Sequence, residues 1–273
     1  MKQNQKNSAL PPSIANSLKQ KTGHILEQNE TGLLIYDEAG KVFMLYQPDE
    51  RAAFYWIQKH LADCPDQSEK LLLVLNPGLE AMLSGFENYE RFTLCRSFTW
   101  PLSISPLQAG RIQKPAVENR LRFEPVLIEE IPEILADYNL ASEEELAFII
   151  ENGMLFWGVD PAGNRIGFSG FHPEGSMGLL HVSEAFRNRG YALQLENFLI
   201  ETALEKGLIP CCDVFENNQA SLNLQKKLGL REEEHPVIWG LFRPSESPTE
   251  KKKEPEEKER GDKDGKFSEQ ISR

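Results

Sequence analysis

The stretch Val182-Ser-Glu-Ala-Phe-Arg-Asn-Arg-Gly-Tyr-Ala192 decides what fold and chemistry to expect of this chain. It joins an expected strand to a long amphipathic helix through the pattern Arg187-x-x-Gly190-x-Ala192. Glycine lets the backbone adopt conformations closed to other residues and approach a ligand closely. The first N–H groups of a helix are unpaired, and the helix dipole favours negative charge there. With Arg187 and Arg189 adding charge, the stretch predicts a pyrophosphate-type anion site, although a tight turn with two solvated arginines has the same pattern.

The elements expected around this loop follow a clear order. The patterns predict a strand, two helices and three strands before the loop, then a helix, strand, helix and strand after it. The expected bounds are 121–126, 129–138, 143–151, 154–159, 166–172 and 177–182, then 190–206, 210–215, 218–228 and 237–242. Ser142, followed three residues later by Glu145, forms a capping-box pattern at the start of the second helix.

The N-terminal half is predicted to be a smaller α/β domain without catalytic motifs. We expect a helix over 14–20, strands over 24–28, 32–36 and 42–46, a helix over 50–61, a strand over 71–75, a helix beginning near residue 77 and a strand over 92–98. Nothing in this half has the pattern of a nucleophile, a metal cluster or a glycine-rich loop. No motif in this half therefore indicates its role.

Changes in composition divide the chain into four segments. Residues 10–105 are the expected N-terminal domain, and residues 119–243 are the expected second domain. The intervening residues 106–118 contain prolines and little periodic apolar pattern, which predicts a linker. Residues 244–273 are charged and almost free of aliphatic side chains, so they cannot bury enough surface to fold and are expected to be a disordered tail.

The chain is acidic, and the acidity belongs to its folded part. Asp and Glu number 42 against 30 Lys and Arg, giving a formal net charge of −12. Charges in the tail nearly cancel, so almost all of this excess lies in the two domains. An acidic surface argues against nucleic acid as a partner, because binding requires cations that displace counterions from phosphates.

The cysteines and the hydropathy indicate an ordinary intracellular protein. Cys64 and Cys95 stand alone, Cys211 and Cys212 are adjacent, and no pair has Cys-x-x-Cys spacing. This pattern predicts reduced thiols, no metal site and a cytoplasmic location. The densest apolar run, Leu71 to Leu75, is far shorter than the ~20 residues that span a bilayer, so no membrane partner is expected.

The order of elements and two motifs resemble the GNAT superfamily of acyl-CoA-dependent N-acyltransferases. The first motif is the Arg187-x-x-Gly190-x-Ala192 loop, and the second is Asn218-Gln-Ala-Ser-Leu-Asn-Leu-Gln-Lys-Lys-Leu-Gly-Leu230. The resemblance implies an α/β (α+β) fold whose C-terminal domain has a mixed, mostly antiparallel sheet flanked by helices. The whole chain is similar to the two-domain glycine N-acyltransferase group, in which the N-terminal unit resembles a degenerate GNAT domain.

The resemblance also implies how the co-substrate, acetyl-CoA or another acyl-CoA, is held. Val182 is expected to pair with the pantetheine arm, where its strand splays from the next one. Asn218 falls where the family places an Asn near that arm, and it is also suited to cap the following helix. The backbone amides expected to cradle the pyrophosphate belong to Arg187, Asn188, Arg189, Gly190, Tyr191 and Ala192.

The catalytic groups depart from the family pattern. The tyrosine that commonly protonates the departing thiolate aligns with Gln225, whose amide is no useful acid. The glutamate found in several members aligns with Ser176, while Glu174 lies two residues earlier and so on the same face of an extended strand. His181 has a suitable pKa but the opposite parity, unless a bulge re-aims it, and His172 is a third candidate base.

These observations predict an N-acyltransferase, and most simply an N-acetyltransferase. The acyl group would pass from acyl-CoA to the primary amine of a small molecule or amino acid by direct attack on the thioester. Glu174 and His181 are the predicted catalytic residues. Two alternatives stay open: a catalytically inactive CoA-binding or structural module, and a protein N-acetyltransferase.

Overall fold

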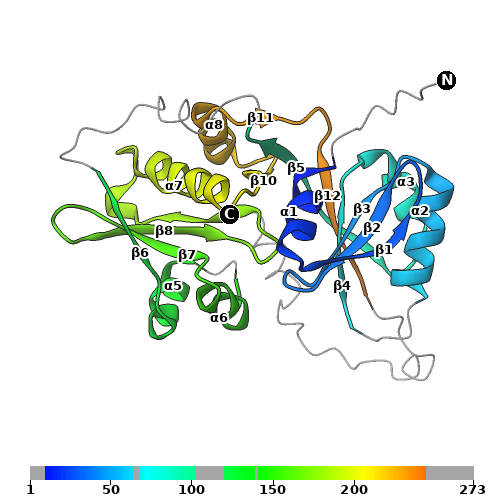
Figure 1. The fold of residues 1–273 in the computed structure, drawn as a ribbon, viewed down its shortest axis with the longest axis horizontal. Coiled ribbons are helices and arrows are strands. Elements are labelled where there is room, and N and C mark those ends of the chain that lie inside the picture. The colour runs from blue at the N-terminus through cyan, green and yellow to red at the C-terminus, as the bar shows by residue number, and fades with distance from the viewer. Residues whose placement is uncertain (1–9, 64–67, 102–119, 139–140, 244–273) are drawn as a thin grey trace, which may run out of the picture.

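The computed structural model describes residues 10–63, 68–101, 120–138 and 141–243, and Figure 1 shows their arrangement. The expected linker at 106–118 and the expected tail at 244–273 lie outside these residues. Most predicted helices and strands are present within one or two residues of their expected bounds.

The larger sheet has eight strands, drawn from both halves of the chain. Its order is β1-β2-β3-β4-β12-β5-β10, and β11 also pairs with β5. All its pairs are antiparallel except β3 with β4. The strands are β1 (Gly23–Gln28), β2 (Leu33–Asp37), β3 (Val42–Tyr46), β4 (Lys70–Val74), β5 (Tyr89–Thr99), β10 (Cys211–Phe215), β11 (Arg231–Glu232) and β12 (Val237–Phe242).

The smaller sheet is antiparallel and has the order β6-β7-β8-β9. Its strands are β6 (Arg122–Pro125), β7 (Leu155–Val159), β8 (Arg165–Phe171) and β9 (Met177–Val182). The expected fold class, a mixed and mostly antiparallel α/β arrangement with flanking helices, is confirmed. The hairpin turn between β7 and β8 is also present, with the Asp160 side chain accepting the N–H groups of Ala162 and Asn164.

Helices cover both faces of the sheets. In Figure 1, α5 and α6 lie on one side of the smaller sheet and α7 lies on the other. Two of the expected helices differ slightly from prediction, since α2 continues into a π-helical turn at Gln58–Ala62 and a 3₁₀ turn at Ile128–Glu130 precedes α5. The helices are α1 (Pro12–Gln20), α2 (Glu50–Ile57), α3 (Glu80–Leu83), α5 (Ile131–Asp137), α6 (Glu143–Glu151), α7 (Tyr191–Glu205) and α8 (Gln219–Leu228).

Strand β5 connects the two halves. One edge of β5 pairs with β12, with Cys95 opposite Val237. Its other edge pairs with β10, with Thr99 opposite Cys211. An N-terminal strand thus lies between two C-terminal strands, and β12 in turn separates β4 from β5. The division of the chain at 106–118 stays a prediction, but the larger sheet is built jointly by residues from either side of it.

Helix α1 docks against the C-terminal half as well. The Asn16 amide donates to the Ile209 carbonyl at 2.8 Å and accepts the Ile209 N–H at 2.8 Å. The Lys19 ammonium reaches the Gly207 carbonyl, and the Gln20 amide donates to the Glu174 carbonyl at 3.2 Å. The Asn16 and Lys19 contacts hold the segment between α7 and β10 against the N-terminal half, and the Gln20 contact holds the β8–β9 turn, which contains Glu174.

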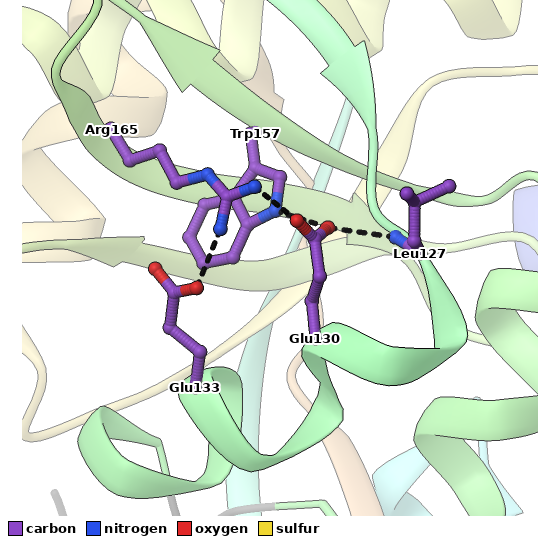
Figure 2. Close-up of polar contacts among 5 residues, drawn as sticks. All are labelled: Leu127, Glu130, Glu133, Trp157 and Arg165. Atoms are coloured by element: carbon purple, nitrogen blue, oxygen red, sulfur yellow. Dashed lines mark hydrogen bonds and ion pairs between the residues drawn. The ribbon is translucent and has the colours of Figure 1, made fainter.

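A polar cluster fixes the start of α5 against the smaller sheet (Figure 2). Glu130 accepts the Leu127 N–H and the Trp157 indole N–H, each at 2.9 Å, and pairs with Arg165. The Arg165 guanidinium lies over the Trp157 ring at 4.6 Å and also contacts Glu133 at 2.5 Å. Burial opposes ionisation of Glu130, but these hydrogen bonds outweigh it and lower its pKa. The cluster thereby positions α5, whose far end reaches the cavities described below.

Replacing Glu130 with Ala should destabilise the fold by about 2 kcal/mol, since three donors lose their acceptor. Glu133→Ala is the matched control and should cost about 0.5 kcal/mol, because its side chain is 52% exposed. Urea unfolding measures both. The pKa of Glu130 is lower in the folded protein than in the unfolded chain. Its contribution to the free energy of unfolding is therefore fully present at pH values above the unfolded-state pKa, and it is lost as the pH falls through the folded-state pKa. Equal losses for the two variants, or an unchanged acid limb of stability in Glu130→Ala, would contradict this account.

Candidate active site

The loop between β9 and α7 has the backbone conformation that the sequence predicts. Asn188 has φ +62° and Gly190 has φ +81°, and Gly190 is the N-cap of α7. A Cβ placed on Gly190 would meet no atom within 4 Å, so the space in front of the helix start is open. The left-handed turn at a non-glycine residue and the open space are both features of a backbone that receives a ligand.

The two arginines of the loop make different contacts. The Arg187 Nε donates to the Val182 carbonyl at 3.0 Å, which ties the loop back to the end of β9. The Arg189 guanidinium lies 5.7 Å from the centre of the Phe186 ring. Arg187 therefore adds charge beside the strand end, whereas Arg189 covers an aromatic ring on the loop.

Strand β9 contains a bulge next to this loop. Phe168 pairs with His181 and Gly170 with Gly178, so β9 has one extra residue between these pairs. Leu179, inside the bulge, has φ +51°, an uncommon conformation for a non-glycine residue. A bulge re-aims side chains and leaves backbone groups outside the ladder. Such a bulge is the condition under which the His181 side chain is predicted to point to the other face of the strand.

A large cavity lies where the edges of the two sheets meet. β9 ends the smaller sheet and β10 ends the larger one, and no ladder joins them among the described residues. The cavity has a volume of about 1220 Å³ and is lined by β9, β10, the loop and the starts of α7 and α8. We call it the first cavity. The predicted binding residues that line it are Val182, Arg187, Asn188, Gly190, Tyr191, Ala192 and Asn218, whereas Arg189 does not.

A second cavity of about 710 Å³ lies on the other side of the β9–β10 junction. The N-terminal half contributes the turn 38–42 and residues of β4 and β5, and the C-terminal half contributes α6 and the β8–β9 turn. The two cavities share part of their lining, so they meet at the junction. The shared residues are Tyr138, His172, Met177, Gly178, Asp213 and Phe215.

The predicted catalytic residues lie in different cavities. Glu174 lines the second cavity and is 6% exposed, and its carboxylate accepts the Ser176 hydroxyl. The displaced glutamate is thus held by the serine that occupies the family position. His181 lines the first cavity, stacks on Phe168 with 5.3 Å between ring centres, and lies 3.9 Å from the Asp137 carboxylate.

His172 is one of the titratable side chains at the junction. It lines both cavities, is 37% exposed, and has its Nδ1 3.9 Å from the Glu145 carboxylate. A Cβ on Gly178 would collide with the His172 Nε2, so the imidazole lies directly against β9 beside the bulge. The absence of a side chain at Gly178 is what makes room for the ring.

Charges around the junction shift the pKa values in ways that favour proton transfer. Burial lowers the pKa of His172, but the carboxylates of Glu145, Glu174 and Asp213 outweigh it and raise that pKa. Burial raises the pKa of Glu174, and burial raises the pKa of Asp213 to about 6. By contrast, burial and the nearby Arg187 lower the pKa of His181. The carboxylic groups at the junction are therefore stronger bases than ordinary ones.

Two functional candidates were missed in the sequence analysis. Asp213 lies in the shared lining, and its carboxylate accepts the Trp239 indole N–H at 3.3 Å. Glu196 is 4% exposed on the inner face of α7 and lines the first cavity. The signal in each case was a charged residue inside an apolar pattern, Cys-Cys-Asp-Val-Phe for Asp213 and Leu-Glu-Asn-Phe-Leu for Glu196.

Residues 120–230 match the family model of the acetyltransferase (GNAT) family. This part of the chain is therefore similar to the GNAT acetyltransferases, a family that transfers acyl groups and uses acetyl-CoA as co-substrate. The predicted resemblance is confirmed at this level, while the two-domain glycine N-acyltransferase group stays a prediction. No curated protein sequence matches the chain.

Three solved structures share the fold. A Drosophila protein has 13% identity and a TM-score of 0.60, with 78% of this chain and 74% of that one covered. A GCN5-related N-acetyltransferase from Kribbella flavida has 10% identity and a TM-score of 0.55, covering 86% and 97%. A putative GNAT-family acetyltransferase from Novosphingobium aromaticivorans has 13% identity and a TM-score of 0.51, covering 85% and 97%. At these identities the likeness concerns the fold alone.

Two further findings bear on other classes of function. None of the helices in the described ranges is long and apolar enough to cross a membrane. Within the same ranges, no three or more His, Cys, Asp or Glu side chains are grouped so that they could hold a metal ion.

Asn218 caps α8, and its side chain accepts the Ser221 N–H at 3.1 Å. Asn218→Ala should therefore cost about 1 kcal/mol of unfolding free energy, whereas Asn218→Ser keeps a capping oxygen and should cost only a few tenths. Urea denaturation measures both. Acetyl-CoA titrations of the same variants separate the two expected roles. If Asn218→Ser binds acetyl-CoA with full affinity, capping of α8 is the sole role of Asn218.

Proposed function

We propose that this protein is an N-acetyltransferase that transfers the acetyl group of acetyl-CoA to the primary amine of a small molecule. One observation carries the proposal: two cavities meet between the edges of β9 and β10, and the first is lined by the left-handed loop that precedes α7 while the second is lined by acidic groups. This arrangement provides separate places for a pyrophosphate-containing donor and a cationic acceptor, with their reactive ends at one junction.

The first cavity fits acetyl-CoA in size and in chemistry. Its volume of about 1220 Å³ admits a large ligand, and the open space before Gly190 is where a Cβ would otherwise obstruct a phosphate. The N–H groups at the start of α7 and the guanidinium of Arg187 would hold the pyrophosphate. Val182 and Asn218 would contact the pantetheine arm. Bound in this way, acetyl-CoA supplies a thioester carbonyl that an amine can attack.

The second cavity supports a small amine as the acceptor. At about 710 Å³ it has the volume of a small-molecule site, and it is enclosed by residues from both halves of the chain. Carboxylates of Glu38, Glu145 and Glu174 give it a negative lining, while Phe92 and Phe148 add apolar surface. These features favour an ammonium group attached to an apolar or aromatic body.

The junction supplies the groups that handle the proton. The N–H groups released by the β9 bulge can donate to the carbonyl oxygen as negative charge develops on it. His172 is the proposed base, because it lines both cavities and three carboxylates stabilise its protonated form. Glu174 and Asp213 would hold that imidazolium. Glu174 and His181 remain alternative bases, each reaching one cavity.

Calorimetric titration tests the donor site. The wild-type protein should bind acetyl-CoA, and Arg187→Glu should weaken binding at least tenfold by replacing an attraction with a repulsion. Arg231→Glu is the matched control, because it makes the same charge change on a side chain that is 74% exposed and outside both cavities. Lack of acetyl-CoA binding by the wild-type protein would refute the proposed function. Equal losses in the two variants would refute the role of Arg187.

The pH dependence of transfer tests the base. Turnover should rise with pH as His172 loses its proton, and His172→Gln should lower it by about 10²-fold or more. Glu145→Gln removes a carboxylate that raises the pKa of His172, so the acid limb should move to lower pH. Glu144→Gln is the control, since it removes the same charge from the same helix and also lines the second cavity. An unmoved limb in Glu145→Gln would leave Glu174 as the better candidate.

A further inference from the structure

Helix α7 carries a carboxylic acid on its buried face. Glu196 is 4% exposed, and the neighbouring inward positions of the helix are the apolar Leu195, Leu199 and Ile200. The Glu196 Oε1 accepts a hydrogen bond of 2.6 Å from the side-chain amide of Gln225. Gln225 is 1% exposed and comes from α8. Two polar side chains therefore face each other where the two helices pack.

The pair is incompletely satisfied. Among the described residues, the Glu196 Oε2 and the Gln225 Oε1 are buried and have no hydrogen-bond partner. Leaving such atoms unpaired is costly, so a purely structural pair would be expected to be saturated or replaced by apolar groups. Both residues line the first cavity, so a ligand bound there is the partner that could satisfy these oxygens.

The surroundings keep Glu196 partly protonated at neutral pH. Burial raises the pKa of Glu196 to about 7, while the Gln225 amide acts in the opposite direction. The titratable group that faces it from β10 is the Cys212 thiol, whose own pKa is raised by burial and by Glu196. The charged side chains of α8, Lys226 and Lys227, are exposed, and Lys226 lies 3.9 Å from Glu232. No cation in the described part of the chain is paired with Glu196.

Glu196 and Gln225 line the first cavity together with Arg187 and Gly190 of the loop. We propose that Glu196, held by Gln225, is the acid that gives its proton to the sulfur released from acyl-CoA. This inference rests on the proposed acyl-transfer function. It also accounts for Gln225 at the position where the family resemblance implies a tyrosine acid. The Gln225 amide would position Glu196, a carboxylic acid from the neighbouring helix, which would take over the role of the tyrosine.

The proton balance is complete with the groups present. The acceptor ammonium first releases one proton to water. The neutral amine nitrogen then forms a bond to the carbonyl carbon as the bond from that carbon to sulfur breaks. The proton lost by the amine goes to His172, and the sulfur takes the Glu196 proton, so the products are the amide and CoA thiol. Glu196 then regains a proton and His172 loses one to water. An acid whose pKa is near the working pH can complete this cycle in each turnover.

Infrared difference spectroscopy tests the inference without an acceptor. A carboxylic C=O band should titrate with a midpoint near pH 7 in the wild-type protein and be absent in Glu196→Gln. Other buried acids contribute bands of their own, and the variant assigns the one from Glu196. Addition of CoA should shift that band, because the thiol would then contact the carboxyl group. Glu201→Gln, an exposed position on the same helix, is the control and should leave the band in place.

Kinetics and stability give a second readout. Glu196→Leu should lower turnover about tenfold or more, and it should also lower the thermal midpoint, because the buried Gln225 amide loses its acceptor. A merely structural glutamate would show the same loss of stability with turnover unchanged. Glu196→Gln should abolish the alkaline fall in turnover that follows from ionisation of Glu196, with acetyl-CoA affinity retained.

The outcomes separate the two proposals. Acetyl-CoA binding and turnover that survive unchanged in Glu196→Gln and Glu196→Leu would overturn the role of Glu196 and leave the acetyltransferase proposal standing. A wild-type protein that binds no acetyl-CoA would overturn the function, even if the carboxylic band titrates. An unshifted band on addition of CoA, in a protein that binds it, would place Glu196 away from the sulfur and refute the inference.

Discussion

The pairing of β5 with β10 is the constraint on which the site depends. Along one edge, β10 pairs with β5 through five residue pairs from Cys211 to Phe215. Along one of its edges, β9 pairs with β8. Because each strand is held by its own sheet, the two free edges meet without forming a ladder, and the cavities open between them. The bulge in β9 then turns backbone groups toward the junction. Space large enough for a cofactor is thus produced by the sheet topology.

The N-terminal half supports this site without carrying a motif of its own. β5 holds β10, and the turn after β2 lies against Glu174, where a Cβ on Gly40 would come within 3.2 Å of the carboxylate. Gln20 of α1 fixes the backbone at Glu174. These are packing and hydrogen-bonding roles, which are distributed over many positions and leave no short pattern in a sequence.

The sequence predicts what depends on neighbours along the chain and misses what depends on distant pairing. The left-handed turn at Gly190, the cap at Asn218 and nearly all element bounds follow from local chemistry. The insertion of β12 between β4 and β5, and of β5 between β12 and β10, cannot be predicted in this way. Hydrophobic alternation indicates that a strand is buried, but it does not indicate which strand it pairs with. The bulge illustrates the limit. Parity placed Glu174 and His181 on opposite faces, and the register shows that one extra residue lies between Gly178 and His181.

The charge of the molecule now has a physical interpretation. In the proposed function, the anionic pyrophosphate would lie at the start of α7 beside Arg187, where the helix dipole and the guanidinium oppose the acidity of the chain. On the other side of the junction, and beneath α7, the acids are buried and their pKa values raised, with Asp213 near 6 and Glu196 near 7. Burying ionisable groups without cations costs stability, and such costs are concentrated where protons are moved. The positions of these acids on either side of one junction, and not the excess of acidic residues as such, connect the composition of the chain to proton transfer.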